Sequence, residues 1–138
     1  LLRPDGSRCS LSLRCAGRFV DRLRGLLGLG PLAQGHGLWL VPCKAVHSFG
    51  MRAPIDLLFV DADFEVVSVR SMFGPWRIAL CRRARSTIEM APGDVIRLRI
   101  TVGSRLVLER PTSTDLRPEP LGRAFDARRS FPGLPKRS

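Results

Sequence analysis

Apolar and polar residues alternate with a period of two along several short stretches of the chain. The first is CSLSLRC at residues 9–15. GLWLVP at residues 37–42 does not alternate, and its short apolar run predicts a buried strand. STIEM at residues 86–90 is another predicted strand, and it ends at the turn-forming APGD. Alternation over four to eight residues is typical of a half-buried strand, so the sequence predicts strands at these places.

The strongest pattern is IDLLFVDADFEVVSV, in which two β-rich runs at residues 55–60 and 64–69 flank Asp61 and Asp63. Aspartate favours tight turns because its carboxylate accepts hydrogen bonds from nearby backbone amides. The pattern predicts a β-hairpin, with Leu57, Phe59 and Val66 in the core. A turn at Gly103 and a last strand are expected after it, whereas VIRLRI at residues 95–100 fits neither a helix nor a strand.

One stretch has the period of a helix instead. RFVDRLRGLLGL places Phe19, Val20, Leu23, Leu26 and Leu27 at spacings of one, three and four, with arginines on the other side. The sequence predicts a short amphipathic helix that ends at the following glycines and proline.

The chain of 138 residues is long enough for one domain with its own core. Residues 110–138 lack apolar periodicity, and seven basic and three acidic residues are scattered among five prolines. We expect a β-rich domain at residues 1–109 and a flexible basic tail at residues 110–138. The predicted fold is mainly β, a compact antiparallel sandwich or barrel with a short N-terminal helix and a disordered C-terminal tail.

The net charge and the cysteines indicate which partners and which cellular compartment to expect. The net charge is +11, from 23 basic and 12 acidic residues, which favours an anionic partner such as nucleic acid, anionic lipid or an acidic protein. A basic protein without such a partner is the competing interpretation. Four cysteines without a disulfide pattern favour reduced thiols in the cytoplasm: Cys9, Cys15, Cys43 and Cys81. No apolar run is long enough for a spanning helix. Export stays an open alternative, since the sequence begins with Leu1.

VHSFGMRAPID at residues 46–56 carries more chemistry than a connecting loop needs. Cys43 and His47 are four residues apart, as in some zinc sites, but further ligands are missing nearby. They could also act as nucleophile and base. The structural alternatives are a buried Cys43, a hydrogen-bonded His47, and an Asp56 that caps loop amides or pairs with Arg52.

Three further features add candidates. Phe49 and Met51 are expected to pack, and Glu89 needs a partner if it faces inward. Downstream of Trp76, RIALCRRARS concentrates arginines that match a phosphate-binding patch as well as an ordinary solvated loop: Arg77, Arg82, Arg83 and Arg85. Aromatic residues are sparse there for a single-strand nucleic-acid site.

CKAVHSFGMRAPIDLLFVDADFEVVSV, followed by STIEMAPGDVIRLRITVGSRL, resembles the prokaryotic family named domain of unknown function 192. That family shows a Cys-x-x-x-His-Thr-Phe-Gly-Met-Arg-x-Pro-Ile-Asp block and a later Glu-x-x-x-Gly. The chain departs from it at Ser48, where threonine is usual, and at Ala53. The resemblance implies a small, mainly β domain and no established activity.

The sequence therefore predicts a non-catalytic binding or accessory module with a pocket near the 47–56 loop, and no cofactor or metal. One alternative is a basic interaction protein that docks nucleic acid or another anionic partner. The other is an enzyme that uses Cys43, His47 and Asp56. The candidate binding residues are Cys43, His47, Met51, Arg52, Asp56 and Glu89.

Overall fold

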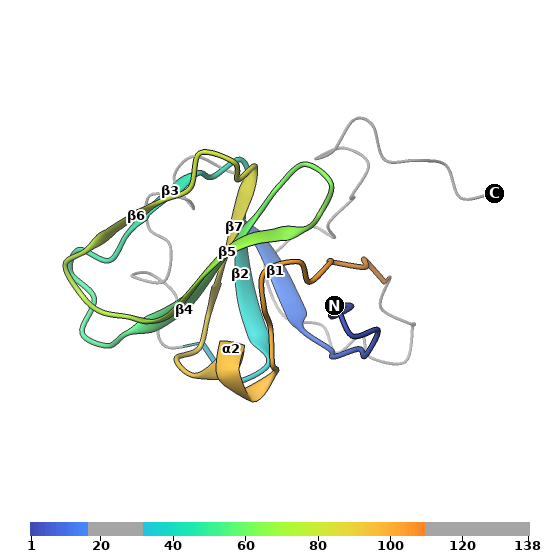
Figure 1. Cartoon of the computed structure of the whole chain (residues 1–138). Helices are drawn as coiled ribbons and strands as arrows, with labels where there is room; N and C mark the ends of the chain where they lie inside the picture. The colour runs from blue at the N-terminus through green and yellow to red at the C-terminus, as the bar shows by residue number, and fades with distance from the viewer. Residues whose placement is uncertain (17–31, 110–138) are drawn as a thin grey trace. The chain divides into compact units, whose positions relative to one another are not determined.

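Seven strands and one four-residue helix make up the secondary structure of the residues that the computed structural model describes, 1–16 and 32–109. Five strands form one sheet in the order β1-β2-β7-β4-β5, and β3 pairs with β6 in a separate two-stranded sheet (Figure 1). The elements are β1 (Ser12–Ala16), β2 (His36–Leu40), β3 (Ala45–His47), β4 (Ile55–Val60), β5 (Val66–Phe73), β6 (Ile78–Leu80), β7 (Ser86–Met90) and α2 (Asp94–Arg97).

The mainly β prediction is confirmed, but the arrangement differs from an antiparallel sandwich or barrel. β1 pairs with β2 in parallel, whereas β2–β7, β7–β4 and β4–β5 are antiparallel, so the larger sheet is mixed and does not close. Parallel neighbours need a connection of a dozen or more residues. The stretch from Ala16 to His36 is long enough for such a connection. The sequence did not predict the parallel pair, because alternation within one strand carries no information on the direction of its neighbour.

The core follows the period of two along the central strands. Leu57 and Phe59 of β4 face the same side as Leu38 and Leu40 of β2, and they form one apolar cluster. Leu58 and Val60 face the other side, and every residue of β4 is buried. The sheet is therefore covered on both faces at its centre. The predicted core residues Leu57, Phe59 and Val66 are all fully buried, which confirms them.

The predicted hairpin is present as β4 and β5. Asp61 Oδ1 accepts hydrogen bonds from the backbone amides of Asp63 and Glu65, both at 3.0 Å, which is the aspartate turn that the sequence indicated. β5 begins later than predicted, at Val66, because Phe64 takes a left-handed conformation with a φ of 64° in the turn.

Elsewhere the element predictions were only partly correct. The turn at Gly103 is present, but the expected last strand is wrong, since Arg105 makes only isolated bridges to Leu2 and Glu65. VIRLRI, which fitted neither template, contributes to α2 and the turn that follows it. The predicted helix at residues 19–27 and the tail at residues 110–138 lie outside the described residues.

Candidate functional site

Most of the VHSFGMRAPID stretch, residues 46–54, belongs to a structure that we call the arm. The arm consists of residues 43–54 and 74–85, in which β3 pairs with β6. The two strands lie to one side of the five-stranded sheet (Figure 1). Val46 and Ala79 are buried and belong to the apolar cluster of the core. The alternate residues face solvent and form the outer face of the arm: Ala45, His47, Ile78 and Leu80.

Ser48 joins the two halves of the arm. It is fully buried, its amide donates to the Arg77 carbonyl at 2.9 Å, and its Oγ accepts from the Arg77 amide at 2.9 Å. The same Oγ donates to the Gly74 carbonyl at 2.7 Å. The Ser48 carbonyl accepts the amide of Trp76 at 3.0 Å and that of Met51 at 3.2 Å. One small residue thus fixes the turn after β3 against the segment before β6.

This frame presents three rings in a row. His47 stacks on Phe49 with ring centroids 5.1 Å apart and planes at 24°, and Phe49 stacks on Trp76 at 6.0 Å and 28°. These distances are those of favourable aromatic pairs. His47 is exposed, Phe49 is 41% exposed and Trp76 is 70% exposed. Phe49 packs, as expected, but against the rings of His47 and Trp76 on the surface and not against the core.

Apolar exposure continues along β6. Ile78 is 66% exposed and is the pairing partner of His47, while Leu80, 58% exposed, pairs with Ala45. Side chains of paired residues in a sheet lie on the same face and in contact range. We therefore call Phe49, Trp76, Ile78 and Leu80, together with His47, the apolar face of the arm.

Backbone strain accompanies this exposure. Trp76 has a φ of 58°, a left-handed conformation that is costly for a bulky residue, and its amide is held by the Ser48 carbonyl. Met72, at the end of β5, has a φ of 52° and is 54% exposed. Such conformations persist where the surrounding bonds impose them, and they are frequent at functional sites. At Trp76 the bend before β6 projects a large apolar side chain into solvent, and at Met72 the same happens within β5, beside the irregularity in its pairing with β4.

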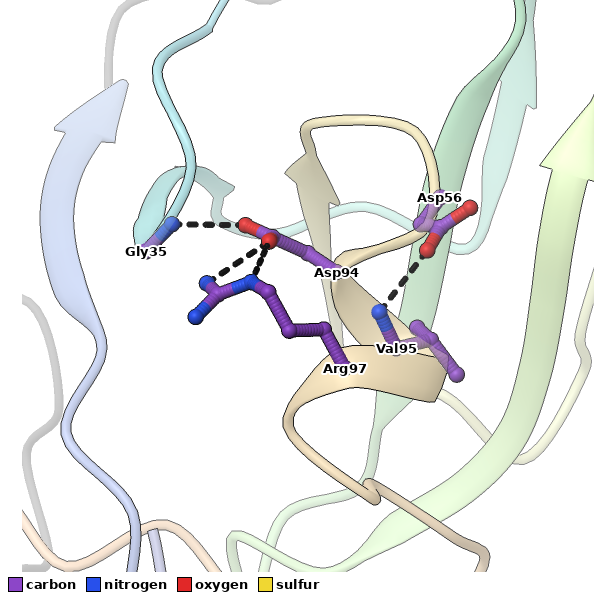
Figure 2. Close-up of polar contacts among 5 residues, drawn as sticks. All are labelled: Gly35, Asp56, Asp94, Val95 and Arg97. Carbon is purple, nitrogen blue, oxygen red and sulfur yellow. Dashed lines mark hydrogen bonds and ion pairs between the residues drawn. The ribbon is translucent and has the colours of Figure 1, made fainter.

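Asp56 has a structural task. It is fully buried, and its two carboxylate oxygens serve different elements. Oδ1 accepts the Met72 amide of β5 at 2.8 Å. Oδ2 accepts the Val95 amide of α2 at 2.8 Å, as Figure 2 shows. The Ser71 hydroxyl lies at 3.4 Å from Oδ1. The carboxylate therefore ties the irregular pairing of β4 and β5 to the start of α2. The amides that Asp56 accepts belong to β5 and α2 and not to a loop, so these bonds join two elements instead of capping loop amides.

Asp94 completes the same junction. It is fully buried, its Oδ2 accepts the Gly35 amide at 2.7 Å, and its Oδ1 pairs with the Arg97 guanidinium at 2.7 Å (Figure 2). Gly93 precedes it with a φ of 84°, a value that favours glycine. Gly93, which ends the Glu-x-x-x-Gly pattern of the family, and Asp94 are therefore explained by the way the chain enters α2 after β7.

The other candidates do not converge with Asp56. Asp56 pairs with Met90 while Glu89 pairs with Leu57, so neighbouring positions in the ladder place the two carboxylates on opposite faces of the sheet. Glu89 is 4% exposed. Cys43 and Met51 are partly buried against the apolar cluster, on the side to which Leu57 faces. Cys43, His47 and Asp56 consequently do not form one catalytic set. His47, at the end of β3, and Arg52, in the loop that follows β3, are both exposed.

In the described residues, the cysteines form no disulfide and the potential metal-ligating side chains form no metal site. All four cysteines lie in the described residues and none forms a disulfide. The Cys43 thiol lies 3.1 Å from the Ala45 carbonyl, to which it donates, and burial raises the pKa of the Cys15 thiol. No cluster of three or more metal-ligating side chains occurs in residues 1–16 and 32–109. In the same ranges, none of the helical structure is long and apolar enough to cross a bilayer.

The arginines of the predicted patch all lie on the arm and are exposed, but they occupy two ends of it. Arg77 stands at the ring end with Arg52. Arg82, Arg83 and Arg85 follow β6, where the Lys44 carbonyl accepts the amide of Cys81. The three residues of β6 separate the two groups by roughly 10 Å.

The arm carries the positive charge of the described domain. It holds six exposed basic side chains and no acidic one. The other described residues are nearly balanced, with seven arginines against eight carboxylates. The arginines are Arg3, Arg8, Arg14, Arg70, Arg97, Arg99 and Arg105, and the carboxylates are Asp5, Asp56, Asp61, Asp63, Glu65, Glu89, Asp94 and Glu109. Basic residues therefore bracket the apolar face at both ends.

A cavity of about 370 Å³ lies elsewhere, beside β1 and β2. It is lined by Ser12, Leu13, Arg14, Leu32, Ala33, His36, Gly37 and Leu38. None of these residues belongs to the 47–56 loop, so the pocket expected beside that loop stays a prediction.

Sequence reasoning missed the apolar face because β3 and β6 are only three residues long. All three residues of IAL are apolar, so this stretch lacks the alternation of apolar and polar residues that indicates a half-buried strand. The stacking of Phe49 on Trp76 joins residues far apart in sequence, and no local pattern indicates it.

Comparisons with known proteins place the chain. The DUF192 family model, described as "Uncharacterized ACR", matches residues 1–108. UPF0127 protein PF1050 of Pyrococcus furiosus is 29% identical over 111 residues, covering 76% of this chain and 93% of that protein. UPF0127 protein PH1112 of Pyrococcus horikoshii is 34% identical over 83 residues, covering 56% and 70%.

Two solved structures share the fold. A Sinorhizobium meliloti protein, described as a "putative transcription regulator", superposes with a TM-score of 0.69 at 22% identity, covering 75% of this chain and 86% of that one. A Novosphingobium aromaticivorans protein of unknown function gives 0.62 at 19%, covering 69% and 73%. Because the family model spans nearly all of the described domain, the chain belongs to the uncharacterised DUF192 family.

Proposed function

We propose that this domain is a non-catalytic binding module that recognises its partner through the apolar face of the arm. The observation that carries the proposal is the stack of His47, Phe49 and Trp76, held on a hydrogen-bonded frame yet open to solvent. Rings and aliphatic side chains gathered on one exposed surface are typical of interaction sites.

The energetics favour a role in binding over one in folding. Ile78 and Leu80 gain little from folding, since more than half of each side chain remains in water. Trp76 in addition occupies a strained conformation. Residues that cost stability in the free protein are expected where a partner later covers them.

The position of the polar candidates also favours binding. Both oxygens of Asp56 accept backbone amides, and Asp56 and Cys43 belong to opposite sides of the sheet. His47 at the end of β3 and Arg52 in the following loop are exposed, so a ring and a guanidinium can contact a partner that is already held by apolar contacts.

Trp76 provides the assay. The chain has two tryptophans, and Trp39 is 1% exposed whereas Trp76 is 70% exposed, so changes in emission on binding report mainly on the arm. We expect one ligand class among oligonucleotides, acidic peptides, lipid vesicles and a small-molecule library to shift the emission. The response should be weakened in His47→Ala combined with Arg52→Ala, and kept in Ile96→Ser.

Ile96 is a control outside the arm: it is 69% exposed, much like Ile78 of the apolar face at 66%, but it lies on α2. The proposal fails if no ligand class alters Trp76 emission. It also fails if the double variant, folded by circular dichroism, keeps every response of the unaltered chain.

A further inference from the structure

We infer that the partner of the arm is the surface of an anionic lipid bilayer, contacted by the apolar face and by the basic residues at its two ends. The partner class rests on the proposed binding role of the arm. Two observations define its chemistry: an exposed strip of aromatic and aliphatic side chains, and six basic residues without a single acidic one.

The apolar part has the composition of a protein segment that sits at a membrane interface. Trp76 and Phe49 supply rings, and Ile78 and Leu80 supply aliphatic chains on the same face of a short sheet. Amphipathic elements that lie in the interface combine tryptophan, phenylalanine and leucine with basic flanks. Acyl chains can cover aliphatic side chains without having to match a hydrogen-bond pattern.

The charged part adds attraction from outside the bilayer. Arg52 and Arg77 stand at the ring end of the face, and Arg82, Arg83 and Lys44 stand at the other. Guanidinium groups bind phosphate oxygens in a forked geometry. A plane of anionic headgroups lies above the acyl chains that would take up Ile78, so one flat partner meets both requirements.

Single-stranded nucleic acid fits the same surface less well. Such sites need free ring faces on which bases stack. Phe49 stacks on both His47 and Trp76, so part of its ring surface is already covered by other rings. Bases would also leave Ile78 and Leu80 without an apolar partner. An acidic protein would have to combine negative charge with its own apolar strip at matching spacing.

The test uses the full chain and vesicles of phosphatidylcholine with about 30% phosphatidylglycerol, with pure phosphatidylcholine vesicles as reference. We expect binding to the anionic vesicles, a blue shift of Trp76 emission, and quenching of Trp76 by lipids brominated on the acyl chain. Binding should weaken as salt rises from about 0.1 to about 0.5 M, because exposed charges are then screened.

Variants separate the contribution of the arm from that of the rest of the chain. Ile78→Ser should lower the vesicle affinity about tenfold, and Ile96→Ser should leave it unchanged. Each basic residue near an anionic surface contributes about fivefold, so Arg82→Gln with Arg83→Gln should lower the affinity about 25-fold. Arg99→Gln removes one charge outside the arm and should have little effect. Circular dichroism checks that each variant is folded.

Three results would overturn the inference. One is the absence of vesicle binding at low salt. Another is binding without quenching of Trp76 by brominated lipid, which would assign the attraction to residues outside the arm. The last is an arm-dependent response to an oligonucleotide or an acidic peptide but not to vesicles. That outcome would leave the proposed binding role intact and change only the partner, whereas no response to any ligand class would reject both.

Discussion

Replacement of Asp56 by asparagine isolates the structural role of the signature aspartate. The two amides that Asp56 accepts reach different oxygens, Met72 at Oδ1 and Val95 at Oδ2. A carboxamide keeps one acceptor oxygen and turns the other position into a donor. In Asp56→Asn one buried backbone amide therefore faces an N–H group, whichever way the carboxamide is oriented.

The cost can be worked out from these contacts. A hydrogen bond to a charged group contributes about 1.5–3 kcal/mol, and a buried donor left without an acceptor costs about 1–3 kcal/mol. The two contributions overlap, and we expect the free energy of unfolding to fall by about 3 kcal/mol. Asp56 is fully buried, so water cannot replace the lost acceptor without a local opening.

Asp61 offers a matched control. It also accepts two backbone amides, from Asp63 and Glu65, but both reach the same oxygen, Oδ1. Asparagine keeps one acceptor oxygen for both, and the turn is partly open to water. Asp61→Asn should therefore cost less than about 1 kcal/mol.

Urea unfolding followed by circular dichroism measures both variants. With an m-value of about 2 kcal/mol/M for a domain of this size, Asp56→Asn should lower the midpoint by roughly 1.5 M and Asp61→Asn by less than about 0.5 M. The reasoning is that Asp56→Asn is costly because the two accepted amides reach different oxygens. Equal losses of unfolding free energy in the two variants, or a loss below about 1 kcal/mol in Asp56→Asn, would refute it.

Three further outcomes follow from single residues. Ser48→Ala should destabilise the domain by about 2 kcal/mol and increase the mobility of Trp76, measured by urea unfolding and fluorescence anisotropy, whereas Ser48→Thr, which keeps the hydroxyl, should lose less. Gly93→Ala should cost about 1 kcal/mol in the same unfolding assay through its φ of 84°, since no atom lies within 4 Å of an added Cβ. The Cys15 thiol should be alkylated at pH 8 more slowly in the native protein than in urea, measured by mass spectrometry, because burial raises its pKa and lowers its thiolate fraction.

The sequence by itself determined the central hairpin, because its signals are local. A β-rich run at Ile55–Val60 and an aspartate that bonds the amides two and four residues on need no information from the rest of the chain. The core residues Leu57, Phe59 and Val66 were expected within the same β-rich runs. The family could also be predicted from the sequence, since its signature block joins a turn, the start of a strand and a buried carboxylate in one continuous stretch.

Tertiary structure decided where the candidate residues go. Asp56 and Glu89 lie on opposite faces because β4 and β7 pair in one particular register, and a shift by one residue would have placed them on the same side. The parallel pairing of β1 with β2 depends on a long connection and not on either strand's own pattern.

The apolar face shows the same division most clearly. Phe49 and Trp76 are 27 positions apart, and only the bonds of Ser48 to both halves of the arm bring their rings together. The sequence supplied the side chains, and hydrophobicity alone favoured burying them. Their exposure is a consequence of the turn geometry and of a sheet so short that its inner face takes only Val46 and Ala79 into the core.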